Sequence, residues 1–182
     1  MAMKACAYVV GPRDGPGAAL RDMASTLGFE TVLPFSTIAA AEQQAAQTPL
    51  LFFLFAAVDD PLTLKPVADA LRLSPGRRIR FSPLIYFSES PSLAAIKCCA
   101  GMGFDDVITL PFLLARVEER LARQVDRTQI YFESASYFGP DRRTSSATRT
   151  LPPARGKHRR LEIIRTTTEG TSVLRDDLHA PT

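Results

Sequence analysis

The chain has 182 residues, of which 46% are hydrophobic and 23% charged, a balance typical of a soluble globular protein with one domain and an extension. No apolar run approaches the roughly 18 residues of a membrane span. The start Met-Ala-Met-Lys lacks a cleavable signal pattern, so a cytoplasmic location is expected. Cys6, Cys98 and Cys99 are odd in number and lie in apolar segments, which predicts buried thiols and neither a disulfide framework nor a metal site.

Positive charge is concentrated near the C-terminus. Residues 1–130 hold 13 Lys or Arg and 13 Asp or Glu, whereas residues 131–182 hold 9 against 6, which accounts for the net charge of +3. Between residues 142 and 165 the only acid is Glu162. A local excess of this kind indicates a local anionic partner.

Short apolar runs alternate with helical patterns over the first 130 residues. Strands are expected at residues 4–10, 29–33, 50–55, 84–87 and 107–109. Helices are expected at about residues 18–27, 36–47, 61–73, 91–100 and 112–127, with Ser36 as an N-cap and Gly28 after the first helix. This alternation predicts an α/β domain at residues 1–130 with a five-stranded parallel, doubly wound sheet. Any site should then lie beyond the carboxyl ends of the strands.

The composition changes after about residue 130. Aromatic residues occur at 131–132 and 137–138, but residues 139–160 offer little to bury. Residues 131–182 are therefore predicted to be a basic, partly disordered, largely irregular arm. Residues 161–165 and 171–174 could form a terminal hairpin around Glu169-Gly170. In the simplest interpretation, the aromatic residues Tyr131, Phe132, Tyr137 and Phe138 pack on the first domain or on a second protomer.

Two segments resemble a known family. Residues 100–112 read AGMGFDDVITLPF, and residues 82–89 read SPLIYFSE. Both resemble the CheY-like receiver domains of two-component response regulators, over about residues 3–128. The resemblance implies a flavodoxin/CheY-like fold and a role in bacterial signalling.

The positions that carry receiver chemistry depart from that family. Gly11 and Pro12 stand where receivers have metal-binding acids, and Leu110 replaces the fifth-strand lysine. The phosphoacceptor position is occupied by Phe55 or Ala57, depending on whether the strand or the loop is aligned. Phosphoryl transfer depends on positioning and on charge neutralisation by metal and cation. The chain is therefore predicted to be a non-phosphorylatable pseudoreceiver without a metal or cofactor.

Ser88 matches the hydroxyl residue that contacts the phosphoryl group in receivers. Without its partner residues, it is interpreted as a strand-end hydroxyl. Asp105 and Asp106 are interpreted as either part of the family signature or a solvated turn. The two histidines, His158 and His179, lie in the polar tail. No catalytic triad can therefore be assembled in the core, and the chain is not expected to be an enzyme.

Receivers signal through their fourth helix, fifth strand and fifth helix, which here predicts a protein-interaction surface. Its expected residues are Ile96, Lys97, Leu110, Phe112, Arg116, Glu119 and Arg120. Leu110 is also expected to seal the old pocket. The partner would be a kinase, a regulator or a flagellar component, and homodimerisation is left open.

The tail suggests an alternative function. Its Gly-Pro-Asp-Arg-Arg element resembles the C-terminal arms of CheY-like proteins that bind cyclic di-GMP. Guanidinium groups can stack on guanine and pair with phosphates, while a carboxylate can accept from the guanine edge. The candidate residues are Tyr137, Asp141, Arg142, Arg143, Arg159 and Arg160. A second alternative is binding of nucleic acid or another anion by the basic tail.

Overall fold

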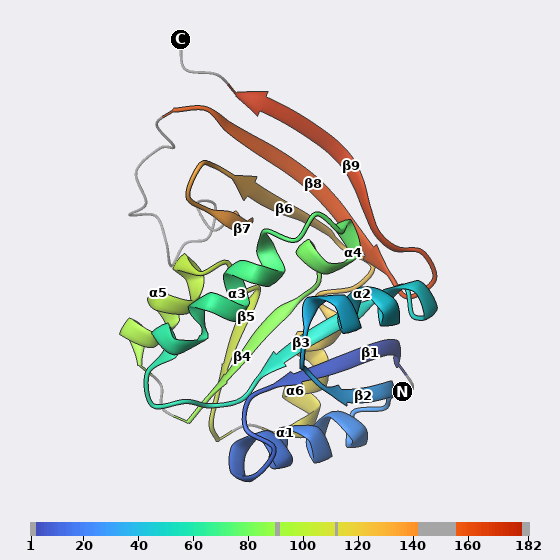
Figure 1. Cartoon of the computed structure of the whole chain (residues 1–182), viewed down its shortest axis with the longest axis vertical. Coiled ribbons are helices and arrows are strands. Elements are labelled where there is room, and N and C mark those ends of the chain that lie inside the picture. The colour runs from blue at the N-terminus through green and yellow to red at the C-terminus, as the bar shows by residue number, and fades with distance from the viewer. Residues whose placement is uncertain (1–2, 90–91, 112, 142–155, 180–182) are drawn as a thin grey trace.

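The computed structural model describes residues 3–89, 92–111, 113–141 and 156–179. They form a parallel sheet covered by helices and, stacked against one end of it, an antiparallel sheet (Figure 1). No helix in this described part is long and apolar enough to cross a bilayer.

The parallel sheet has five strands in the order β2-β1-β3-β4-β5. Its strands are β1 (Met3–Val10), β2 (Phe29–Pro34), β3 (Leu51–Phe55), β4 (Leu84–Ser88) and β5 (Asp106–Thr109). The central strand β3 has the sequence LFFLF and is buried at every residue, as expected for a parallel strand covered on both faces. The predicted α/β fold class with a five-stranded parallel sheet is confirmed.

Helices cover both faces of this sheet. They are α1 (Gly15–Thr26), α2 (Ile38–Gln47), η1 (Pro61–Leu64), α3 (Lys65–Arg72), α4 (Arg77–Arg80), α5 (Leu93–Gly101) and α6 (Leu114–Ala122). One apolar cluster joins the sheet to α2, η1, α3, α4 and α5. The other joins it to α1 and α6. The side chains of β3 alternate between the two clusters, so this strand lies at the centre of the core.

Several helices differ from their predicted bounds. Thr37, and not Ser36, caps α2, since its hydroxyl accepts from the Ala40 N–H at 3.1 Å. The helix expected at 61–73 is divided into η1 and α3, with Asp60 capping η1. The helix expected at 112–127 ends at Ala122. Asp126, two residues before β6, has a φ of +56°.

The C-terminal part forms a second sheet in the order β7-β6-β8-β9. Its strands are β6 (Thr128–Glu133), β7 (Phe138–Pro140), β8 (His158–Thr166) and β9 (Gly170–His179). The predicted hairpin exists, but it is longer than expected and belongs to this sheet. The extension, predicted from its composition to be largely irregular, thus contains four strands among its described residues. One face of their sheet contributes Tyr131, Phe138, Leu161 and Ile163 to a buried cluster with Phe81 of the first domain.

The second sheet covers the amino-terminal ends of β3, β4 and β5. Phe81 precedes β4 and packs on Tyr131 and Phe138, with ring centroids 5.4 and 5.1 Å apart. Gly170, in the β8–β9 turn, lies against Pro49, so that a Cβ there would be 2.4 Å from the Pro49 carbonyl oxygen. The opposite, carboxyl edge of the parallel sheet remains open.

A buried charge cluster joins the two sheets. Asp105 is 1% exposed and receives Arg72 at 2.6 Å and Arg165 at 2.8 Å, both of them buried. The Tyr131 hydroxyl donates to the same carboxylate, and the Leu84 N–H donates to it at 2.8 Å. Asp105 is therefore not part of a solvated turn.

Candidate functional site

The carboxyl edge of the parallel sheet is where a receiver would carry its phosphorylation site. Phe55, at the end of β3, is fully buried with its ring centroid 4.7 Å from that of Phe104. Gly11 follows β1 at φ +149°, and a Cβ there would lie 2.8 Å from the Ala56 Cβ. The backbone after β1 therefore packs directly against the residue after β3. Little room therefore remains at Phe55, one of the two candidate acceptor positions.

The carboxylates near this edge are exposed loop residues, of which Glu89 directly follows β4. Asp14 precedes α1 and is exposed, without a side-chain capping bond. Asp59 and Asp60 are exposed in the loop after β3, and Asp60 accepts from the Leu62 N–H at 3.0 Å as the cap of η1. Among the described residues, no group of three or more His, Cys, Asp or Glu could hold a metal ion.

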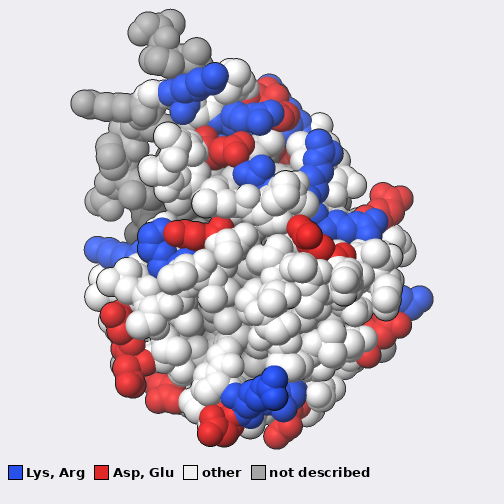
Figure 2. Space-filling model, in the orientation of Figure 1, with Lys and Arg blue, Asp and Glu red and all other residues white. Residues whose placement is uncertain are grey.

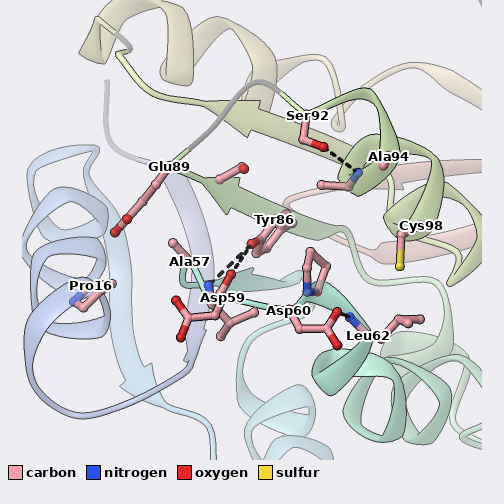
Figure 3. Close-up of a pocket in the computed structure, with 14 residues that line it drawn as sticks. Pro16, Ala57, Asp59, Asp60, Leu62, Tyr86, Glu89, Ser92, Ala94 and Cys98 are labelled. Atoms are coloured by element: carbon pink, nitrogen blue, oxygen red, sulfur yellow. Dashed lines mark hydrogen bonds between the residues drawn. The ribbon is translucent and has the colours of Figure 1, made fainter.

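A cavity of about 580 Å³ lies beside this packed end, between the β3–η1 loop and the start of α5, and Ala57, the other candidate acceptor position, lines it (Figure 3). Several of the residues that line this cavity have small side chains, namely Ala57, Ser88, Ala94 and Ala95. Asp59 and Glu89 lie on one side, and Cys98 lies on the other (Figure 3). Three carboxylates and no lysine or arginine line this cavity.

Tyr86 crosses the cavity from β4. Its hydroxyl donates to the Val58 carbonyl at 3.3 Å and accepts from the Val58 N–H at 3.4 Å. Burial raises the pKa of Tyr86, and bonds from Val58 and Ser88 oppose that rise only in part. Ser88 is buried at the end of β4, where its carbonyl accepts from the Leu110 N–H at 2.9 Å. The phenol therefore remains protonated and tethers the loop after β3.

Leu110 does not seal a pocket, so that expectation is wrong. Its side chain is 42% exposed, and it is absent from the lining of the cavity. The next apolar residues along the chain are also exposed, Leu113 by 72% and Leu114 by 41%. Helical spacing places both on the same face as Val117 and Leu121. Of that face, α6 buries only Val117 and Leu121.

The other residues of the predicted interaction surface divide into two groups. Lys97 and Arg116 are exposed, and Phe112 lies outside the described residues. Ile96 packs partly into the core, Arg120 pairs with Asp106, and Glu119 pairs with Arg123. Of the predicted surface, Lys97, Leu110 and Arg116 remain exposed.

The nucleotide-binding candidates do not form one site in the described part of the chain. The Tyr137 hydroxyl donates to the Pro140 carbonyl at 3.0 Å, and the Asp141 N–H donates to Ile130. Arg159 and Arg160 lie in β8, where Asp176 and Glu162 hold them. Arg142 and Arg143 lie outside the described residues. The cyclic di-GMP and nucleic-acid alternatives thus stay predictions from the sequence.

Reasoning from the sequence missed the charge cluster around Asp105. A signal was present in β8, where Leu161, Ile163 and Arg165 alternate and all face inward. An arginine in register with two buried apolar residues must find buried partners. No comparable signal marks Arg72, which ends the short helix α3.

Comparison with known proteins gives similarity in fold alone. No family model and no curated protein matches the sequence. Among solved structures, a response regulator of red light signalling in R. palustris is 17% identical with a TM-score of 0.44, covering 65% of this chain and 89% of that one. The receiver domain of a sensor histidine kinase from Pseudomonas aeruginosa, with magnesium in its active-site cleft, is 21% identical with a TM-score of 0.43, covering 65% and 94%.

Proposed function

We propose that this chain is a phosphorylation-independent interaction module with a receiver-like fold, acting in two-component-type signalling by binding a protein and not by catalysis. The proposal rests on the close packing at the carboxyl end of β3. Phe55 is buried against Phe104, and Ala56 is packed on Gly11. An acceptor aspartate needs metal ligands and a cation beside it. Here the cation position holds the half-exposed Leu110.

Loss of phosphorylation is tested with the purified full chain. Acetyl phosphate and a histidine kinase, each with magnesium, are expected to leave its intact mass unchanged, while a receiver domain that keeps its acceptor aspartate gains one phosphoryl group. Denaturation in mild acid before mass spectrometry preserves an acyl phosphate. A stoichiometric, base-labile mass gain on this chain would refute the proposal.

Three leucines support binding through the end of β5 and the start of α6. Leu110, Leu113 and Leu114 are 42, 72 and 41% exposed, and Arg116 lies two residues further. Neighbouring exposed apolar side chains are typical of interaction surfaces. We propose that the partner, a kinase, regulator or flagellar component, covers these leucines.

A matched pair of variants tests the leucine surface. Leu113 and Leu73 are each 72% exposed, and Leu73 lies at the end of α3 on another side of the domain. Leu113→Lys is expected to weaken binding of the captured partner at least about tenfold, whereas Leu73→Lys leaves it unchanged. The partner is identified by mass spectrometry and its binding is then measured with purified proteins. Equal binding by the two variants would exclude this surface.

A further inference from the structure

The outer strand of the C-terminal sheet has one free edge. β9 is the last strand in the order β7-β6-β8-β9, and it is ten residues long. In Figure 1 it lies at the outer rim of the molecule, with no described strand beyond it. An edge of this length presents a row of backbone donors and acceptors that can pair with another strand. The opposite edge, β7, has only three residues.

β9 exposes apolar side chains that a second strand could cover. Leu174 and Leu178 are 56 and 58% exposed. Between them lie Arg175, Asp176 and Asp177, so both signs of charge occur on one short edge. Figure 2 shows basic and acidic side chains interleaved over the upper part of the molecule, where this sheet lies, whereas the middle of the same face is largely uncharged.

From this edge we infer that the chain forms a homodimer in which β9 pairs antiparallel with β9 of a second copy. A two-fold axis through Asp176 would place Arg175 opposite Asp177 of the partner subunit. It would also bring Leu178 of the partner subunit near Leu174, which is the extra residue of the bulge opposite Glu162 and Ile163. Each pairing occurs twice, as two-fold symmetry requires. The two four-stranded sheets would then form one continuous sheet.

The existing ion pairs favour this register. Asp176 would face its own copy, but Arg159 already binds that carboxylate through Nε at 3.0 Å, which offsets the repulsion. Arg175 and Asp177 are 2.7 Å apart within one strand. In the dimer, Arg175 and Asp177 of both copies would form a row of alternating charges across the two-fold axis. A register centred on Asp177 would place that residue against itself and Arg175 against a histidine, so it lacks both the leucine pairs and the ion pairs.

The charges also explain why the edge would select its own copy. Charged residues on edge strands usually prevent pairing with arbitrary strands. In β9, however, Arg175 faces Asp177 when a second copy pairs in the antiparallel direction. The same charges that disfavour other strands therefore favour pairing with a second β9. This inference does not depend on the proposed function, because β9 belongs to the C-terminal sheet, whereas Leu113 precedes α6 on the first domain.

Charge reversal tests the pairing without touching the core. Arg175 and Asp177 are 62 and 30% exposed, so R175D and D177R should both fold, as circular dichroism and the unfolding midpoint will verify. Analytical ultracentrifugation of the wild-type full chain over the micromolar range is expected to give a dimer. Each variant alone should dissociate at least about tenfold more readily, because like charges then face each other twice. The control R116D changes the same charge on α6 and should dimerise like the wild type.

Mixing the two variants gives the decisive readout. The R175D chain would carry acids at both positions and the D177R chain bases at both, so their mixture should form a heterodimer. In a Cys98→Ser background, D176C should also form a disulfide-linked dimer under mild oxidation, whereas L174C should not. A wild-type monomer at all concentrations overturns the inference. So does a dimer that neither variant weakens, or a mixture that stays monomeric.

Discussion

At the scale of single residues, the Asp105 carboxylate determines how the two sheets hold together. It lies between two buried guanidinium groups, at 2.6 Å from Arg72 and 2.8 Å from Arg165. Arg165 also donates to the Phe81 carbonyl at 2.7 Å and to Gln129 at 2.7 Å. A buried pair contributes modest net stability, but removing one partner leaves a desolvated charge. The cluster therefore acts mainly by penalising separation of the sheets.

Asp105→Asn is expected to lower the free energy of unfolding by about 3–5 kcal/mol, since it leaves two buried cations without their carboxylate. The matched control is Asp106→Asn, the next residue, whose partner Arg120 is 37% exposed. That change should cost at most about 1 kcal/mol. Urea unfolding at neutral pH, followed by circular dichroism, measures both. Equal losses would show that the cluster has no special role.

The same two proteins should differ in their response to acid. Burial tends to raise the pKa of Asp105, but Arg165, Arg72 and the bonds from Tyr131 and Leu84 outweigh it, so the pKa lies below its usual value. A lowered pKa in the folded state stabilises the protein above the unfolded-state pKa, and that contribution is lost as pH falls through the folded pKa. The stability gap between the wild type and Asp105→Asn should therefore narrow below about pH 4. A constant gap down to acid unfolding would contradict this.

At the scale of elements, the sequence correctly predicts that a hydroxyl residue caps α2, but the structure places this N-cap one residue later. Thr37 accepts from the Ala40 N–H, whereas Ser36 lies outside the helix. Thr37→Ala should therefore cost about 1 kcal/mol of stability, the usual value of an N-cap. Ser36→Ala should cost less than about 0.5 kcal/mol. If thermal unfolding ranks the two variants in the reverse order, the assigned cap is incorrect.

The parallel sheet could be predicted from the sequence, because its strands are encoded locally. The run LFFLF needs two covering layers wherever it lies, and Gly28 ends the first helix at φ +80° as its position indicated. The short strand β7 is different, since Gly139 and Pro140 have little intrinsic preference for a strand. It forms because Gly139 approaches Gly103 so closely that a Cβ would lie 2.6 Å from the Gly103 Cα. Such a contact joins residues far apart in the chain and leaves no periodic pattern.

For the candidate site, the sequence predicts which functional residues of receivers are replaced in this chain. Gly11, Phe55 and Leu110 indicated that the acceptor, metal ligands and lysine are replaced. The cavity beside them was not predictable, since it results from the path of the β3–η1 loop past Tyr86. The exposure of Leu113 was not predictable either, since helical spacing places it on the face of Val117 and Leu121, whereas it is 72% exposed.

At the scale of the whole molecule, the two edges of the parallel sheet have different roles. The second sheet covers the amino-terminal edge through the cluster of Phe81, Tyr131 and Phe138. The carboxyl edge keeps the cavity, and the exposed Leu110 follows the end of β5. The C-terminal extension is thus part of the folded core and leaves the surface proposed for a partner uncovered.

This arrangement predicts that the receiver-like part does not fold stably alone. A chain ending at residue 127 would lose Tyr131 and Arg165, expose Phe81, and leave Arg72 and Asp105 at a bare surface. Uncovering one large aromatic side chain costs about 1.5–3 kcal/mol, and Asp105 would also lose the bonds from Arg165 and Tyr131. Together these losses are a substantial part of the total stability of about 5–15 kcal/mol of a small domain. We therefore expect the truncated chain to bind a hydrophobic dye and to unfold without a cooperative transition, while the full chain unfolds cooperatively. A truncated chain with a sharp thermal transition near that of the full chain would show that the second sheet is an independent appendage.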